Sequence, residues 1–169
     1  MNEKEKKELP KLARKAIEGF LKGEKVSYEK SKEKKGVFIT LTKKGELRGC
    51  IGTIEPEEIH KAVVEKAIGA AFYDPRFEPV TEDELKDIQI EVSLLTKPEK
   101  CEIKDIKKGD GVIIKYGYQT ATFLPQVWED LKTKEEFMGH LCMKAGLEKD
   151  FWKTGKLKVQ KYKAEKIKE

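Results

Sequence analysis

The sequence predicts an α+β fold, with helices flanking a mainly antiparallel or mixed sheet. Helical and strand patterns alternate irregularly along the chain, and three of the strands arrive in or near hairpins, which favours antiparallel pairing over a doubly wound parallel sheet. Hydrophobic residues reach 38% of the composition and recur in periodic runs, so the chain can build a core. At 169 residues, we expect positions 1–169 to fold as a single domain.

The first half of the chain contains two expected helices and a hairpin. Apolar residues recur at three- and four-residue spacing over residues 3–21, which predicts an amphipathic helix. Residues 36–42 are rich in β-branched and aromatic side chains, and a turn at 43–45 joins them to a second strand at 45–53. A proline followed by two glutamates predicts that the next helix begins at Pro56 and runs to about Phe72.

The second half repeats this mixture of short helices and strands. The expected elements are an extended loop at 74–80, a short helix from 81, a strand at 88–94, hairpin strands at 111–116 and 118–124, helices at 125–131 and 134–145, and a tail strand near 157–162. Cys101 is expected in a polar loop, and the lysine-rich tail is expected to form a solvated sheet edge.

Charge and cysteine usage restrict the class of protein. The net charge of +5 comes from 36 basic and 31 acidic residues whose signs alternate along the chain, so a clustered nucleic-acid footprint is not favoured. No apolar run is long enough to span a membrane or serve as a signal peptide. Cys50, Cys101 and Cys142 are isolated, without metal-ligand spacing. We expect a cytoplasmic protein with reduced thiols, no metal and no cofactor.

The segment at 45–53 concentrates the unusual chemistry. In an extended strand, Arg48 and Cys50 share one face, roughly 6–7 Å apart, so the guanidinium favours the thiolate form of the cysteine. Gly49 and Gly52 flank the cysteine and allow a ligand or another backbone to approach closely. These features outline a small candidate site.

Cys50 has two interpretations. It is either a reactive or ligand-contacting thiol, or a small buried residue in a glycine-rich strand. A catalytic role needs a general base, and the local sequence contains none. His60 and His140 reach it only if the fold brings them close, so catalysis is the less favoured use.

Arginine is used sparingly. The chain has three arginines, Arg14, Arg48 and Arg76, against 33 lysines, which suggests that their planar geometry matters. A guanidinium suits bidentate binding of a carboxylate or phosphate. Arg76 therefore either binds an anionic ligand or forms an internal pair with Asp74 that fixes the proline-containing loop.

Four ordered motifs resemble those of the AMMECR domain family. They are LRGCIGT at 47–53, AAFYDPRF at 70–77, TFLPQVW at 122–128 and FMGHLCMKAGL at 137–147. The likeness covers nearly the whole chain and is strongest to the compact prokaryotic branch called AmmeMemoRadiSam system protein A.

The resemblance implies a two-lobed α+β fold in which both termini contribute to the larger lobe. It also implies a system with a Memo-like protein and a radical S-adenosylmethionine enzyme, whose metal chemistry would reside in those partners. The residues carried over by the match are Arg48, Gly49, Cys50, Gly52, Asp74 and Arg76. His140 lies in a variable part of its motif.

The leading hypothesis is an accessory protein that offers a cleft around the LRGCIG strand to an anionic small molecule, a modified residue or a partner. One alternative is a thiol-dependent transferase or hydrolase that uses Cys50. Another is a nucleotide- or RNA-binding module that acts through the sheet and depends steeply on salt.

Overall fold

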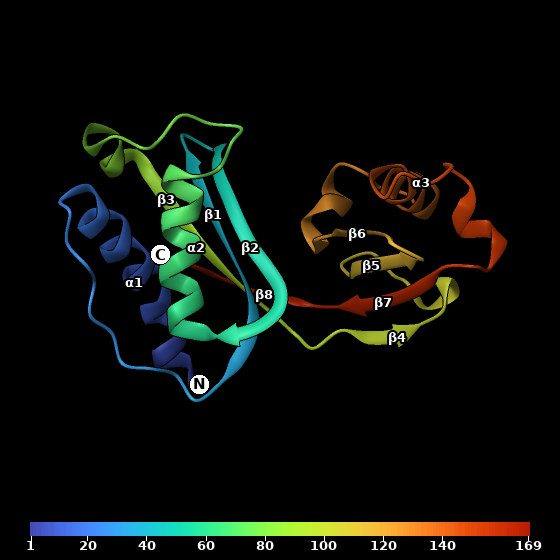
Figure 1. The fold of residues 1–169 in the computed structure, drawn as a ribbon, viewed down its shortest axis with the longest axis horizontal. Coiled ribbons are helices and arrows are strands. Elements are labelled where there is room, and N and C mark those ends of the chain that lie inside the picture. Colours follow the sequence, from blue (N-terminus) through green and yellow to red (C-terminus); the bar gives the residue numbers. More distant parts are fainter. The chain divides into compact units, whose positions relative to one another are not determined.

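The computed structural model describes residues 1–169, which divide into two compact units (Figure 1). The first unit comprises Met1–Leu95 and Glu165–Glu169, so it contains both termini, and the second comprises Thr96–Ala164. Each unit has its own four-stranded sheet. Helices and antiparallel sheets together confirm the expected α+β fold.

The first unit consists of a sheet with two helices on one face. Its elements are α1 (Glu3–Leu21), β1 (Lys34–Lys43), β2 (Glu46–Glu58), α2 (Ile59–Phe72), the 3-10 helix η1 (Glu82–Asp87), β3 (Ile88–Leu95) and β8 (Ala164–Lys168). The strand order is β2-β1-β3-β8, which leaves β2 at an edge. Ile39 and Leu41 of β1 are fully buried in the core that both helices share. The opposite face of the sheet carries Thr40.

The hairpin between β1 and β2 contains a bulge at Arg48. Lys44 and Gly45 both have positive φ, as a type I′ two-residue hairpin turn requires. Thr42 pairs with Leu47, but Leu41 pairs with Gly49, so Arg48 is the extra residue in β2. Without the bulge, Arg48 would lie opposite buried Leu41 and its guanidinium would point under the helices. The bulge interrupts the alternation of side chains in β2 and so keeps the guanidinium of Arg48 out of the core.

The expected start of the second helix at Pro56 is wrong. Strand β2 continues to Glu58, where Lys34 pairs with Glu58 and Lys35 pairs with Glu57. An edge strand tolerates proline, whose missing N–H group is not needed for pairing on the open side. The Glu58 carboxylate accepts hydrogen bonds from the N–H groups of His60 and Lys61, so the helix begins only at Ile59.

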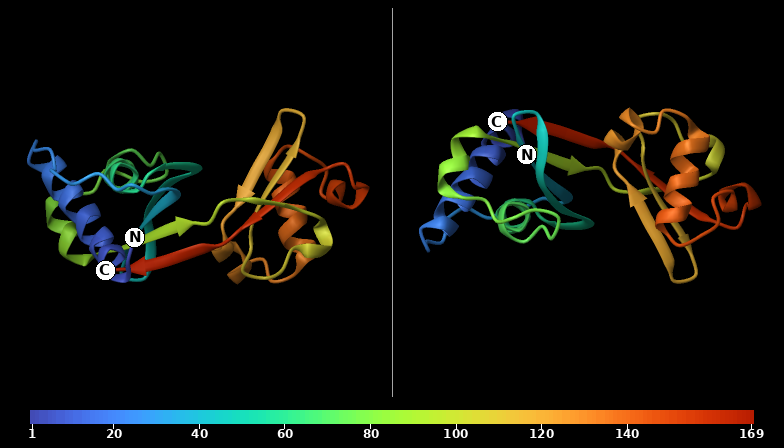
Figure 2. Two further views of the ribbon diagram at one scale, coloured as in Figure 1. Left: turned by 90° about the horizontal axis from the view of Figure 1, so that it is seen from below. Right: turned by 90° about the horizontal axis from the view of Figure 1, so that it is seen from above.

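The second unit places one helix and several 3-10 turns around a smaller sheet (Figure 2). Its elements are β4 (Glu99–Cys101), η2 (Ile103–Asp105), β5 (Gly111–Tyr116), β6 (Gln119–Phe123), η3 (Pro125–Glu129), α3 (Lys134–Lys144), η4 (Phe151–Thr154) and β7 (Lys158–Tyr162). The strand order is β4-β7-β5-β6. Trp128 stacks on Phe137 of α3 at 4.0 Å between ring centroids, and its indole N–H donates to the Asp110 carbonyl. These rings anchor the core of the unit.

One expectation for this unit is wrong. Cys101 ends a short strand instead of lying in a loop, because Glu99–Cys101 pairs with β7. The strand expected near 157–162 is β7, which is interior because it pairs with both β4 and β5 and buries Val159 and Tyr162. The apolar positions of β7 pack into the sheet while its lysines remain at the surface. The edge expected of the lysine-rich tail is formed by β8, at the end of the first unit's sheet.

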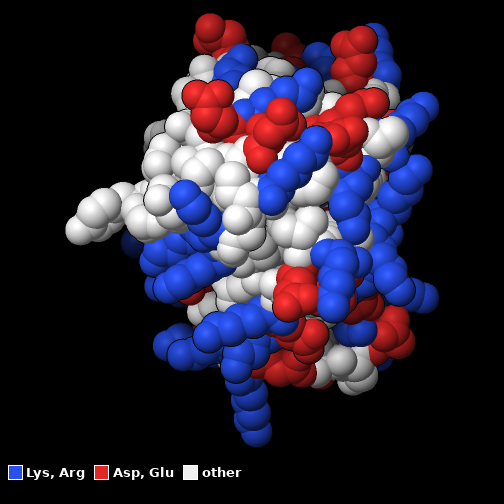
Figure 3. Space-filling view, turned by 90° about the vertical axis from the view of Figure 1, so that its right-hand side faces the viewer, with Lys and Arg blue, Asp and Glu red and all other residues white.

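Surface charge is mixed in sign. Basic and acidic side chains lie among one another on the face in Figure 3, although basic ones gather at its lower left and along its right margin. None of the helices has the length and apolar character needed to cross a membrane.

Candidate functional site

The site lies at the free edge of β2, in the first unit. On the side of β2 away from β1, the Cys50 N–H donates to Oδ2 of Asp74 at 2.9 Å. The Cys50 carbonyl accepts a longer hydrogen bond of 3.4 Å from Nη2 of Arg76. The Asp74–Arg76 pair therefore satisfies both backbone groups that a neighbouring strand would satisfy, which protects this edge at Cys50.

Asp74 is the buried member of the pair, with 4% of its surface exposed. Its carboxylate accepts from Nε and Nη2 of Arg76 at 3.0 and 2.7 Å, and from the Arg76 N–H at 3.1 Å. The bond with the Arg76 side chain holds the pKa of Asp74 far below its usual range, and the N–H groups of Cys50 and Arg76 add to this effect against the opposing effect of burial. The carboxylate is therefore a fixed acceptor and not a proton donor.

Arg76 is held on one side and open on the other. The bonds to Asp74 fix Nε and Nη2, while Nη1 makes no hydrogen bond and 55% of the side chain is exposed. The guanidinium lies 5.3 Å from the ring centroid of Phe77. The pKa of Arg76 is raised, mainly by the hydrogen bond to Asp74 and by the negative charge of that carboxylate. An aligned, exposed guanidinium of this kind can bind a carboxylate or phosphate.

Arg48 is engaged elsewhere. Its Nε and Nη2 donate to the two carboxylate oxygens of Glu84 at 2.8 and 3.0 Å. Glu84 also accepts from the Thr81 N–H, and Lys43 lies 3.2 Å away. Hydrogen bonding to Arg48 is the main cause that lowers the pKa of Glu84 to about 2. Arg48 therefore fixes η1 against the hairpin, and its buried Nη1 has no partner.

The Cys50 thiol lies half-buried on the sheet face that the helices leave open. Its polar side-chain neighbour is the Thr40 hydroxyl, at 3.5 Å on the directly opposite residue of β1. A hydroxyl is not a base at neutral pH. His60 contacts the Glu29 carbonyl through Nδ1, and His140 is exposed on α3 of the second unit. The arrangement presents a thiol without supplying a proton acceptor for it.

The two glycines of the motif serve close packing. A Cβ on Gly49 would lie 2.1 Å from the carbonyl oxygen of Ala70, so β2 and the backbone of α2 approach each other only because this residue has no side chain. A Cβ on Gly52 would lie 2.2 Å from the ring of Phe38, which occupies that part of the open face. Gly49 and Gly52, which are candidate ligand-binding residues by sequence, therefore pack against protein atoms.

Known proteins match this chain over nearly its whole length. The AMMECR1 family model matches residues 10–167. The chain belongs to the AMMECR1 family. It is 46% identical to protein Mbar_A1807 of Methanosarcina barkeri, over 86% of this chain and 81% of that protein. It is 42% identical to protein MJ0810 of Methanocaldococcus jannaschii, over 92% and 85% respectively.

A solved structure also matches this AMMECR1 chain. The crystal structure of the uncharacterized protein PH0010 from Pyrococcus horikoshii superposes with a TM-score of 0.85 at 39% identity, covering 95% of this chain and 89% of that one. A likeness of this extent includes both units. It supports the α+β fold and does not assign an activity.

Sequence reasoning missed two residues of this AMMECR1 site, Glu84 and Thr40. Glu84 lies in the short helix expected from 81, and its spacing from Thr81 predicts the capping box that is present. Its second role, as the partner of Arg48, joins residues 36 positions apart. Thr40 faces Cys50 only because the bulge shifts the register by one residue. Neither contact has a local sequence signal.

Proposed function

We propose that this AMMECR1-family protein is an accessory binding protein, and that the surface around Cys50 and Arg76 contacts an anionic group of a small molecule, a modified residue or a partner. The observation that carries the proposal is the state of Arg76. Its guanidinium is aligned by a buried carboxylate, yet 55% of its side chain is exposed with Nη1 free. Prealigned arginine loses little conformational entropy when it binds a carboxylate or phosphate.

Cys50 and Thr40 extend this surface. Thr40 also lines a shallow cavity of about 360 Å³ on the open sheet face, together with Gln89, Glu91 and Lys168. A ligand that contacts Arg76 at the edge of β2 could therefore continue across the thiol onto the sheet. The polar lining suits hydrogen bonding more than the burial of a large apolar group.

Binding is favoured over catalysis by Cys50. A thiol-dependent transferase or hydrolase needs a base that removes the thiol proton, and the hydroxyl of Thr40 cannot do so. Arg48 is neutralised by Glu84, so the charge that the sequence assigned to activation of the thiol is used in a structural pair. Cys50 remains a contact residue in this proposal.

We further propose that the partners are a Memo-like protein and a radical S-adenosylmethionine enzyme in the cytoplasm. The support is the resemblance of the four motifs to the AmmeMemoRadiSam system protein A branch, together with three free cysteines, which suit a reducing compartment. No metal ligand set is required of this chain, because the partners would supply the metal chemistry.

The test is anaerobic co-purification of the tagged full chain with each candidate partner. Arg76→Gln is expected to reduce retention of the partner at least tenfold, whereas Lys25→Gln, which removes one charge at an exposed position of the same unit, leaves it unchanged. Cys50→Ser is expected to retain the partner, which distinguishes a binding surface from thiol chemistry. Failure of the wild-type chain to retain either partner would refute the system proposal. Equal retention by Arg76→Gln would refute the surface.

A further inference from the structure

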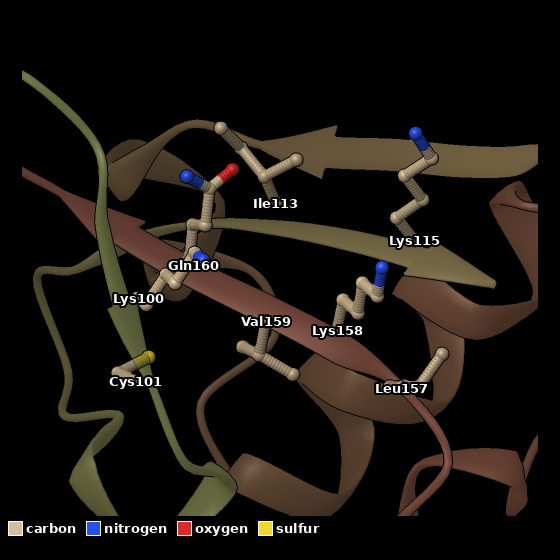
Figure 4. Close-up of a pocket in the computed structure, with 8 residues that line it drawn as sticks. All are labelled: Lys100, Cys101, Ile113, Lys115, Leu157, Lys158, Val159 and Gln160. Atoms are coloured by element: carbon tan, nitrogen blue, oxygen red, sulfur yellow. The ribbon is translucent and has the colours of Figure 1, made fainter.

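The second unit has a cavity on the side of its sheet opposite α3. It has a volume of about 410 Å³ and is lined by residues of β4, β5 and β7 and by the segment just before β7. Lys115 and Ile113 of β5 and Lys158 and Gln160 of β7 project from their strands toward the same side (Figure 4). Lys100 of β4 and Leu157 complete this part of the lining.

Two of the cavity's lysines lie directly opposite each other on neighbouring strands. Lys115 and Lys158 are direct cross-strand neighbours in the register of β5 and β7. Like charges in that position repel and destabilise a sheet. The diagonal neighbour Lys100 lies opposite Gln160, so a third positive charge is close by. The strand pairing therefore gathers positive charge instead of dispersing it.

No acidic side chain lines this cavity to offset the repulsion. Acidic residues of the unit neutralise other lysines: Glu135 pairs with Lys153, and Asp110 pairs with Lys163. Burial raises the pKa of the Cys101 thiol at the cavity wall, so this group stays neutral and adds no negative charge of its own. The local charge is therefore unbalanced on a surface that is otherwise mixed in sign.

We propose that this cavity binds a small organic phosphate that carries two or more negative charges. The lysines at positions 100, 115 and 158 contact the phosphate oxygens, since an ammonium group is a compact donor for phosphate. Ile113 and Leu157 contact the carbon skeleton, and the amide of Gln160 donates to or accepts from a polar group on it. The volume lies in the range of small-molecule sites, roughly 300–1,000 Å³.

A small molecule fits this cavity better than single-stranded RNA. Proteins that bind single strands stack successive bases on aromatic side chains, and no aromatic residue lines the cavity. Tyr162, on the same strand as Lys158, is 2% exposed and its hydroxyl is hydrogen bonded to Thr122. The cavity lining offers positive charge, an apolar wall and one side-chain amide, and these groups together suit a small phosphorylated molecule.

The test is calorimetric titration of the full chain, at low salt, with pyrophosphate and with ADP as probes. Wild-type protein is expected to bind both saturably, with ADP tighter because of its organic part. The double variant Lys115→Gln/Lys158→Gln is expected to weaken binding at least tenfold. The double variant Lys25→Gln/Lys30→Gln removes the same charge from exposed positions of the first unit and should bind as wild type does.

Three results would overturn the proposal. One is the absence of saturable binding of either probe up to about 10 mM, which is weaker than a specific cavity should give. Another is equal affinity for the probes in the two double variants, which would mean that binding depends only on the net charge of the protein. The last is a single-stranded RNA oligonucleotide that binds far more tightly than ADP and displaces it, which would assign the face to nucleic acid.

Discussion

Replacing Asp74 by asparagine tests whether the Asp74–Arg76 pair protects the edge of β2. The amide keeps one oxygen but places an N–H group where the other oxygen accepted, so either the Cys50 N–H or the Arg76 N–H loses its acceptor. A buried donor without a partner costs about 1–3 kcal/mol, and the charge on the remaining bonds is lost as well. We expect Asp74→Asn to lower the free energy of unfolding by about 2–3 kcal/mol.

Arg76→Gln should cost less than Asp74→Asn, because the Asp74 carboxylate keeps the backbone N–H donors of Cys50 and of residue 76, although it loses the charged partner that lowers its pKa most. The measurement is urea unfolding followed by circular dichroism, with amide hydrogen exchange at Cys50 to localise the effect. Asp83→Asn, at an exposed residue of η1, is the matched control and should stay within about 0.5 kcal/mol of wild type. Equal destabilisation by Asp74→Asn and Arg76→Gln, or unchanged exchange at Cys50, would refute the edge-protection role.

Three further predictions concern other contacts. Glu84→Gln should lower stability at neutral pH by about 2–3 kcal/mol. Hydrogen bonds from Arg48, from the Thr81 N–H and from Lys43 together lower the pKa of Glu84 from 4.5 to about 2, and one pKa unit is worth about 1.4 kcal/mol. This contribution to stability is present above the unfolded pKa of Glu84 and is lost as the pH falls through about 2. The urea midpoints of wild type and variant should therefore converge in acid, and a constant difference between the midpoints across this pH range would contradict the prediction. Gly49→Ala should cost at least about 3 kcal/mol or prevent folding, because its Cβ would overlap a carbonyl oxygen of α2; a fully stable variant in thermal unfolding would show that the two elements can separate. Lys115→Glu should raise stability by about 0.2–1 kcal/mol by creating an opposite-charge pair with Lys158 while abolishing phosphate binding, and a loss of stability would mean that the like-charge pair is not strained.

Elements with long periodic patterns could be predicted from the sequence, because their packing follows from the pattern itself. The helix expected at 3–21 is α1, and the alternating strand expected at 88–94 is β3 with one further residue. Proline and glutamate at 56–58 favour a helix start locally, whereas pairing of β2 with β1 continues the strand to Glu58, five residues past its expected end at 53. Tertiary pairing overrides a local preference here.

Of the contacts at the site, too, some could be predicted from the sequence and others could not. The Asp74–Arg76 pair joins residues two positions apart, and the sequence suggested it as one of two alternatives. The bond from Cys50 to Asp74 spans 24 positions and depends on how the loop after α2 returns to the strand edge. The bulge at Arg48 was not predictable, because a regular two-residue turn would continue the register without interruption. That single extra residue decides which side chain faces the thiol.

The geometry separates the LRGCIG strand into a supporting part and a presenting part. Arg48 binds Glu84 and Gly49 packs on α2, so both residues hold the strand in place and are unavailable to a ligand. Cys50 takes part in both: its backbone is held by Asp74 and Arg76, while its thiol faces the open sheet surface. Arg76 is divided likewise, with Nε and Nη2 bound inward and Nη1 free. Only groups that remain exposed after these contacts are made can recognise a partner, and on this strand edge they are the thiol of Cys50 and the outer edge of Arg76.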